Sequence, residues 1–237
     1  TDVLSDKKLI AAFFNTLKYV AIVVPVQTFL AMLIASVLNS NIKGKNTFRI
    51  IYFLPTLTSS AALTLIFMFM FNQEGLINMF LKVFGVQGKN WLDDVDFVLK
   101  VIMAMNIWST VPFFMTIYLA GLQDVPATQY EAASIDGANA WQRFLYITVP
   151  NLRPITAFVV IMGLIGCFQV FDQAYIVSKG TGGPGTATLT LVLLIYQYAF
   201  AGKPNMGRAT ALAFILALFI MGVTYLAKRF SKEESLY

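Results

Sequence analysis

The chain has 237 residues, of which 58% are hydrophobic and only 12% are charged, against about 25% charged in a typical soluble domain. So few charges cannot cover a surface in contact with water, so we expect a single all-α domain that crosses a membrane several times. The net charge is +5, but the basic residues lie in short pieces between apolar runs, which argues against a nucleic-acid partner.

The residue counts also restrict the chemistry. There is no histidine, and the one cysteine is Cys167. These counts exclude Ser-His-Asp and Cys-His nucleophile pairs, His-containing metal sites and an intrachain disulfide. No phosphate-binding GxxxxGK[ST] pattern occurs either. We therefore predict no catalytic residue, no metal site and no cofactor in this chain.

Five stretches are long and apolar enough to cross the roughly 30 Å hydrocarbon core as helices. In chain order, these spans cover residues 13–38, 48–71, 97–122, 155–177 and 209–227. A further apolar piece, residues 186–200, is short for a full span. There we predict a short or re-entrant helix that is shielded by protein.

Two basic clusters favour the cytoplasmic side of the membrane. They are Lys43, Lys45 and Arg49 after the first span, and Lys228, Arg229 and Lys232 after the last. The acidic loop 72–96 suits the outside. This orientation also places the basic residues Lys179, Lys203 and Arg208 outside, which the rule does not favour. We predict an external start and a cytoplasmic C-terminus. The number of predicted spans is odd and the chain starts outside. We therefore also expect one earlier span before Thr1.

The link between the third and fourth spans, residues 123–154, is longer than a simple connection requires. Its first half predicts a helix that starts near Pro126 and runs through Ile135, because proline suits a first helical turn. Asp136 and Gly137 then supply a turn in which glycine can take a positive φ. The link therefore has the pattern of a helix–turn–helix.

The second half of this link predicts another short helix. Trp141, Phe144 and Leu145 share one helical face at i, i+3 and i+4. Pro150 and Pro154 should end this helix and return the chain to the membrane, since proline cannot continue a helix.

At these residues the chain resembles the EAA loop of binding-protein-dependent ABC importer permeases. That family's pattern is Glu-Ala-Ala, three residues, Gly, nine residues, Ile, any residue, Leu and Pro. The residues in register are Glu131, Ala132, Ala133, Gly137, Ile147 and Pro150. Only Val149 departs, where the family has leucine. Tyr130 and residues 141–144, 168–175, 181–184 and 196–200 are similar to maltose, multiple-sugar and glycerol-phosphate permease subunits.

The resemblance implies a MetI-like transmembrane bundle of the type I ABC importer kind, with six core spans, in a bacterial or archaeal cell membrane. It implies a second related permease, two ATP-binding subunits that hold ATP and Mg²⁺, and an extracytoplasmic solute-binding protein as partners. The coupling loop would sit in a cleft of the ATPase, with the turn at Gly137 in close backbone contact and Glu131 either a charged contact or a carboxylate that stabilises its own helix. The coupling residues implied are Glu131, Ala132, Ala133, Asp136, Gly137, Trp141, Ile147 and Pro150. The expected function is a permease for a sugar, in particular an oligosaccharide. The alternatives are a permease for glycerol-phosphate, amino acids or peptides, and a secondary transporter.

Polar residues inside spans are costly and tend to face a protein interior or a watery cavity. The fourth span carries Gln169, Asp172 and Gln173 at positions that share one face of a continuous helix. At about 1.5 Å per residue, Gln169 and Asn106 of the third span lie at similar depth. We predict that Asn106, Gln169, Asp172 and Gln173 line the substrate path, with Trp108 or Tyr175 as stacking surfaces. Alternatively, these residues join helices or contact the second permease.

Overall fold

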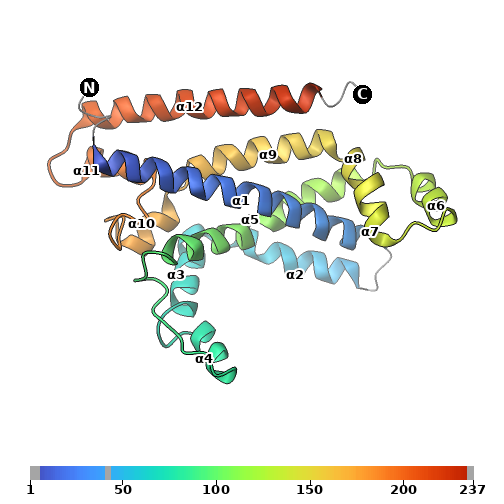
Figure 1. The fold of residues 1–237 in the computed structure, drawn as a ribbon, viewed down its shortest axis with the longest axis horizontal. Coiled ribbons are helices and arrows are strands. Elements are labelled where there is room, and N and C mark those ends of the chain that lie inside the picture. The colour runs from blue at the N-terminus through green and yellow to red at the C-terminus, as the bar shows by residue number, and fades with distance from the viewer. Residues whose placement is uncertain (1–5, 41–43, 234–237) are drawn as a thin grey trace. The chain divides into compact units, whose positions relative to one another are not determined.

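The computed structural model describes residues 6–40 and 44–233, so Lys43 of the first predicted basic cluster lies outside the described residues. All regular elements in the described part are helical (Figure 1), which confirms the predicted all-α class. They are α1 (Lys7–Asn39), α2 (Lys45–Leu57), α3 (Ser60–Met70), α4 (Leu76–Val83), α5 (Val98–Leu122), α6 (Ala127–Ile135), α7 (Ala140–Arg143), the π-helical segment η1 (Phe144–Thr148), α8 (Val149–Asn151), α9 (Arg153–Phe168), α10 (Asp172–Ser178), α11 (Leu191–Phe200) and α12 (Met206–Glu233).

Four helical stretches in the described part are long and apolar enough to cross a membrane. They are Lys7–Asn39, Val98–Leu122, Arg153–Ser178 and Met206–Arg229. These stretches coincide with the first, third, fourth and fifth predicted spans. The predicted short helix at residues 186–200 is α11, which has only ten residues.

The second predicted span, residues 48–71, is not one straight helix. It consists of two helices, α2 and α3, which form a bent pair with a break at residues 58 and 59. The Ser59 backbone is extended, and its side chain accepts a hydrogen bond from the N–H of Ala62. A serine in this position caps the start of a new helix, because it satisfies one of the four N–H groups that have no partner within the helix.

The chain divides into two compact units. In the described part, the first unit comprises residues 6–23, 58–107 and 164–222. Its centre is α11, whose capping residue Thr190 accepts a hydrogen bond from the N–H of Leu193. The buried Thr16 hydroxyl of α1 accepts a hydrogen bond at 3.0 Å from the N–H of Leu191. These bonds give two backbone N–H groups at the start of α11 an acceptor without water. Backbone groups inside a membrane protein need such internal partners.

The second unit comprises residues 24–57, 108–163 and 223–233 in the described part of the chain. Its interior joins α1, α5 and α9 through a few polar contacts. The Thr110 hydroxyl donates to Oε1 of the buried Gln27 at 2.8 Å, and the Tyr118 hydroxyl donates to Oγ1 of Thr156 at 3.1 Å. Gly163 of α9 leaves the space that Gln27 occupies, since a Cβ there would lie 2.5 Å from Nε2 of Gln27.

This close approach predicts that Gly163→Leu destabilises the second unit. Inserting a side chain into a filled space costs about 1–3 kcal/mol, which outweighs the gain of about 0.8 kcal/mol from replacing a helical glycine. The midpoint of thermal unfolding in detergent should therefore fall. Gly166→Leu, one turn along α9, is the matched control, because a Cβ at Gly166 meets nothing within 4 Å. Equal midpoints for the two variants would contradict this account.

Candidate functional site

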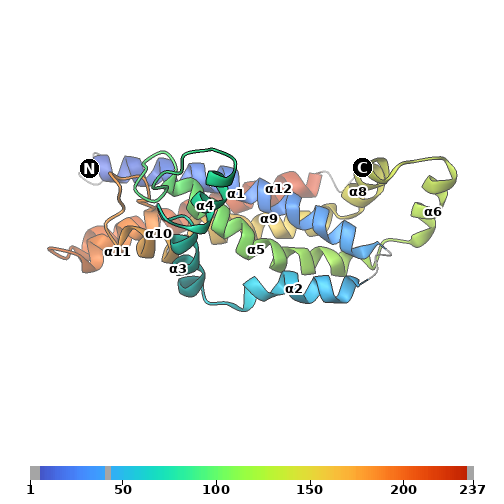
Figure 2. The same cartoon turned by 90° about the horizontal axis from the view of Figure 1, so that it is seen from below.

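The predicted coupling loop folds as a helical hairpin that projects from the end of α5 and the start of α9 (Figures 1 and 2). Its first arm is α6, which ends at Ile135 as predicted. Pro126 has an extended backbone and precedes the first helical residue, Ala127. A proline in that place is tolerated because its missing N–H would have no partner in the helix.

The turn at the tip of the hairpin has the predicted geometry. Gly137 has a φ of +79°, a left-handed conformation that glycine adopts without steric cost. The N–H of Ala138 donates to the carbonyl of Ala133 at 2.9 Å, which closes the end of α6. A Cβ built on Gly137 would meet nothing within 4 Å. The turn therefore presents bare backbone to whatever approaches it.

The second arm consists of α7, η1 and α8 and starts with a capping box. The Asn139 side chain accepts from the N–H of Gln142 at 2.9 Å, and the Gln142 side chain accepts from the N–H of Asn139 at 2.8 Å. Two N–H groups at the start of this arm are thus satisfied by side chains. The arm begins in one defined position after the turn.

The second arm ends between the two predicted prolines, but Pro150 itself is still helical. Pro150 lies inside α8, which ends at Asn151, and Pro154 lies in the first turn of α9. A proline ring inside a helix clashes with the carbonyl four residues earlier and cannot donate to it. Just before Pro150 the helix widens to the π form, and the N–H of Val149 bonds to the carbonyl of Phe144. This wider turn accommodates the proline without ending the helical path.

Three side-chain hydrogen bonds hold the two arms together. The hydroxyls of Tyr130 and Thr148 lie 2.9 Å apart. Nη1 of Arg143 donates to the Ser134 hydroxyl at 2.8 Å, and Nδ2 of Asn151 donates to Oε1 of Gln129 at 2.9 Å. The hairpin is therefore an element whose two arms are cross-braced by side chains.

The predicted coupling residues differ in exposure. Glu131, Ala132, Asp136, Gly137 and Trp141 are exposed, whereas Ala133, Ile147 and Pro150 are half-buried. The Trp141 ring stacks on Phe144 at a centroid distance of 5.3 Å, and Phe144 meets Phe29 of α1 edge-on at 6.5 Å. The hairpin is thus packed against α1 through aromatic rings.

Sequence reasoning missed Ile135 as a member of the hairpin's surface. It is 87% exposed, beside the Gly137 turn. The available signal was an isolated isoleucine next to an Asp-Gly turn, where a polar residue is usual. The Glu131 side chain forms no hydrogen bond or ion pair with another residue in the described part of the chain. Both side chains are therefore available to a partner.

The capping box gives a prediction about the hairpin alone. Asn139→Ala removes the acceptor for the N–H of Gln142 and should cost about 1 kcal/mol of local stability. Hydrogen exchange at that amide should become about fivefold faster, if exchange occurs through local opening. Asn139→Asp keeps the acceptor and should retain the slow exchange. Unchanged exchange in the alanine variant would show that this cap does not hold the arm.

The predicted substrate-path residues lie on α5, on α10 and between α9 and α10. Asn106 is half-buried and Trp108 is exposed, both on α5. Gln169 is exposed and lies between α9 and α10, and the exposed Asp172 is the first residue of α10. The prediction that Gln169 shares a continuous helical face with Asp172 and Gln173 is wrong, because the helix stops at Phe168 and resumes at Asp172.

The interruption between α9 and α10 has a visible cause in the first unit. The buried Thr190 hydroxyl donates to the carbonyl of Val170 at 3.0 Å. That bond satisfies a carbonyl that is freed where the helix stops, so the break exposes no unpaired backbone oxygen at this position. Broken helices of this kind form the ion and substrate sites of many transporters, because their free ends present polar backbone groups.

Gln173 and Tyr175 have partners inside the first unit. Nε2 of Gln173 donates to the Ser60 hydroxyl at 3.0 Å and so joins α10 to α3. The Tyr175 ring lies 5.4 Å from Phe171 and 5.1 Å from Tyr196, measured between centroids. The structure thus gives Gln173 a role in packing, while Gln169 and Asp172 expose their polar groups.

Comparison with known proteins agrees with this geometry. A family model described as "Binding-protein-dependent transport system inner membrane component" matches residues 27–234. The lactose transport system permease protein LacF of Rhizobium radiobacter is 34% identical over 226 residues, 94% of this chain and 76% of its own length. The trehalose/maltose transport system permease protein MalF of Thermococcus litoralis is 34% identical over 233 residues, 98% of this chain and 78% of its own. The arabinooligosaccharides transport system permease protein AraP of Bacillus subtilis is 32% identical over 234 residues, 96% of this chain and 73% of its own.

Solved structures share the fold. A chain from a bacterial ABC transporter involved in the import of the acidic polysaccharide alginate superposes with a TM-score of 0.81 at 22% identity, covering 98% of this chain and 82% of that chain. A chain from the alginate transporter in complex with a periplasmic protein that holds an alginate pentasaccharide gives a TM-score of 0.86 at 22% identity, covering 98% and 81%. At this identity the likeness concerns the fold alone.

Proposed function

Because the chain belongs to the family of binding-protein-dependent transport system inner membrane components, we propose that it is the permease subunit of an ATP-driven sugar importer, with an oligosaccharide as its substrate. The named relatives are permeases of lactose, trehalose/maltose and arabinooligosaccharide systems, and each matches more than nine-tenths of this chain. The observation that carries the proposal is the cross-braced hairpin from α6 to α8, because a membrane bundle can be driven by a soluble motor only through a stiff contact.

The hairpin is the point where the ATPase attaches. Its exposed Glu131, Ile135 and Trp141 surround a turn whose Gly137 adds no side chain. Such a surface fits a cleft in which backbone approaches backbone closely and a few side chains supply charge and apolar contact. ATP and Mg²⁺ are held by two copies of the ATPase, so hydrolysis takes place outside this chain. The hairpin and the C-terminus are on the cytoplasmic side, in accordance with the basic residues that follow the last span.

A second related permease completes the path, and an extracytoplasmic solute-binding protein delivers the sugar. One of the similar solved structures was obtained in complex with a substrate-loaded periplasmic protein, which supports this kind of partner. ATP binding draws the two ATPases together and pulls the hairpins inward. The spans then tilt and open the path toward the binding protein, and hydrolysis returns them. Gln169 and Asp172, at the broken helix, offer an amide and a carboxylate to sugar hydroxyls.

Reconstitution tests the proposal directly. The complex of both permeases and the ATPase is placed in liposomes, and uptake of radiolabelled oligosaccharides is measured with the cognate binding protein. We expect uptake that requires ATP, the ATPase and the binding protein together. Uptake driven by an ion gradient without the ATPase would overturn the importer assignment. ATP-driven uptake of amino acids or peptides, but not of sugars, would overturn the substrate assignment.

A further inference from the structure

The short helix α4 exposes an apolar face that no described residue covers. Leu76, Met79, Phe80 and Val83 are spaced at i, i+3, i+4 and i+7, which places them on one side of the helix. Their exposed fractions lie between 54% and 81%. At about 1.5 Å per residue, the eight-residue α4 is roughly 12 Å long and cannot cross a membrane.

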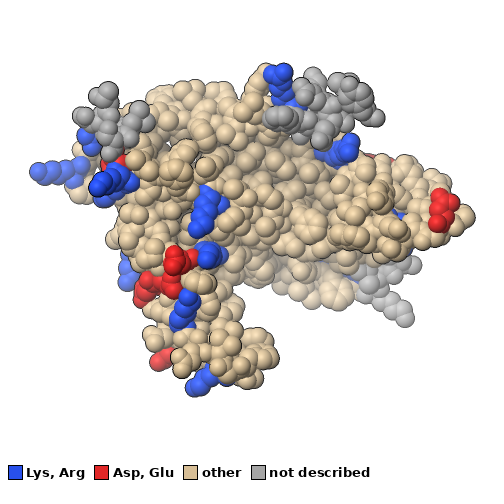
Figure 3. Space-filling model, in the orientation of Figure 1, with Lys and Arg blue, Asp and Glu red and all other residues tan. Residues whose placement is uncertain are grey.

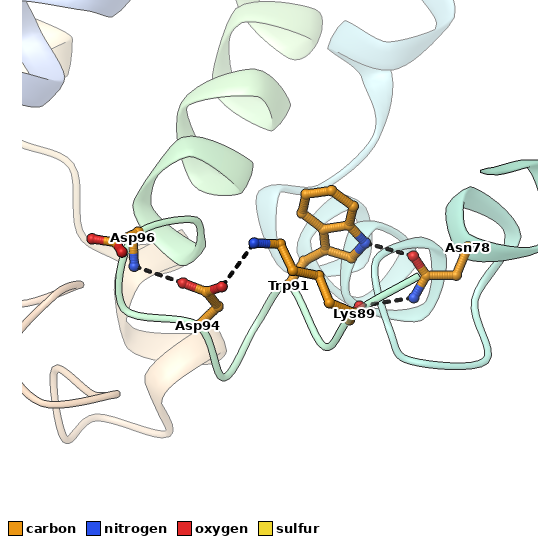
Figure 4. Close-up of polar contacts among 5 residues, drawn as sticks. All are labelled: Asn78, Lys89, Trp91, Asp94 and Asp96. Carbon is orange, nitrogen blue, oxygen red and sulfur yellow. Dashed lines mark hydrogen bonds and ion pairs between the residues drawn. The ribbon is translucent and has the colours of Figure 1, made fainter. Parts of the chain in front are cut away.

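The opposite side of α4 is fixed to its own loop by a buried asparagine (Figure 4). Nδ2 of Asn78 lies 3.2, 3.0 and 2.8 Å from the carbonyls of Asn72, Gln73 and Lys89. Its Oδ1 accepts a hydrogen bond at 2.7 Å from Nε1 of Trp91. At about 100° per residue, Asn78 lies on the far side of the helix from Leu76. The apolar face therefore points away from this polar centre.

Lys89 extends the same polar centre. Its Nζ donates to Oδ2 of Asp94 at 2.9 Å and lies 3.4 Å from the centroid of the Phe97 ring. The hydrogen bond from Lys89 holds the pKa of Asp94 below its usual value. Several acidic side chains gather over this loop between α3 and α5 (Figure 3). The loop is thus folded and charged around Asn78 and Lys89. The apolar residues of α4 lie on the side of the helix that faces away from this polar centre.

Chain length keeps α4 close to the membrane. Only residues 71–75 separate α4 from α3, and five residues reach at most about 17 Å. The preceding α3 belongs to the bent apolar pair, and its Leu65, Ile66 and Phe69 are themselves exposed. The exposed apolar face of α4 thus follows a second exposed apolar surface along the chain. The one charged residue on α4 is Lys82, whose long side chain can keep its ammonium at the lipid phosphates while the apolar face enters the acyl chains.

We propose that α4 is an interfacial helix, which lies in the plane of the membrane surface with Leu76, Met79, Phe80 and Val83 among the acyl chains and Lys82 at the phosphates. Its occupant is phospholipid, and the Asn78 centre holds the helix in the orientation that this requires. The helix anchors the outer loop, and with it the α3 end of the bent pair, against the bilayer.

Site-directed fluorescence in the assembled transporter tests this. The background variant is Cys167→Ala, since Cys167 is the chain's one cysteine. Single cysteines are introduced by Phe80→Cys and Val83→Cys on the apolar face, and by Gln87→Cys in the exposed loop as the control. Each is labelled with a polarity-sensitive fluorophore in nanodiscs that contain phosphatidylglycerol, with and without lipids that carry a nitroxide high on the acyl chain.

We expect labels at positions 80 and 83 to emit at shorter wavelength and to lose about half of their intensity or more to the lipid nitroxide. The label at 87 should respond only to a water-soluble quencher. Water-soluble quenching at 80 and 83 would overturn the proposal, because the face would then lie in solvent. A short-wavelength emission that lipid nitroxide leaves unchanged would also overturn it, because a protein partner would then cover the face. Neither result depends on which solute is transported.

Discussion

The variant Gly137→Asp should fold normally and yet bind the ATPase at least about tenfold more weakly, which corresponds to about 1.4 kcal/mol. Asp tolerates the left-handed conformation better than most residues, so the positive φ of 79° costs the hairpin only about 1 kcal/mol. A Cβ at Gly137 meets nothing within 4 Å in this chain. Loss of the ATPase would therefore arise from the partner's surface. The measurement is the amount of ATPase that co-purifies with the permease, together with ATP-driven uptake.

The matched control for Gly137→Asp is Gly85→Asp. Gly85 also has a positive φ, of 73°, and also has no atom within 4 Å of its Cβ position, but it lies in the loop after α4. Both variants thus carry the same backbone strain and the same added charge. Only the variant in the hairpin should release the ATPase. If both variants release it, the effect is general destabilisation, and if neither does, the turn is not the contact.

The hairpin could be predicted from sequence because its signals are local. The Asp-Gly turn and the end of α6 at Ile135 follow from turn chemistry over a few residues. The bonds that make the hairpin stiff could not be predicted in the same way. Tyr130 and Thr148 are 18 positions apart, and their contact requires the two arms to be in register. Nor does a proline pattern reveal that Pro150 lies in a helix that continues through a π-helical turn.

For the membrane helices, the presence of each helix could be predicted from sequence, but its interruptions could not. Their existence follows from long apolar runs, but a run that is apolar on every side has no periodicity to mark an interruption. The break before Asp172 depends on the Thr190 hydroxyl bonding to Val170, a contact across 20 positions. The bend before α3 has a local signal in Ser59, which caps the new helix. The helix–helix role of Gln173 likewise depends on Ser60, 113 positions away.

The second large effect concerns the polar groups at the broken helix. Asp172→Leu should lower ATP-driven uptake about tenfold or more, because a hydrogen bond to a charged group contributes about 1.5–3 kcal/mol. Gln169→Leu should lower it about fivefold, since a neutral hydrogen bond contributes about 1 kcal/mol. Both side chains are exposed, so their replacement breaks no contact that holds the first unit together. The complex should therefore assemble in normal amounts, and the ATPase activity without sugar should be unchanged.

Gln173→Leu provides the internal comparison, because Gln173 bonds to Ser60 and joins α10 to α3. We expect this variant to lower the thermal stability of the complex, and to lower uptake only as far as less of the complex assembles. Uptake is therefore divided by the amount of assembled complex in every variant. Near-normal uptake per complex in both Gln169→Leu and Asp172→Leu would remove these residues from the path. A stability loss in Asp172→Leu that equals the loss in Gln173→Leu would assign Asp172 to helix packing instead.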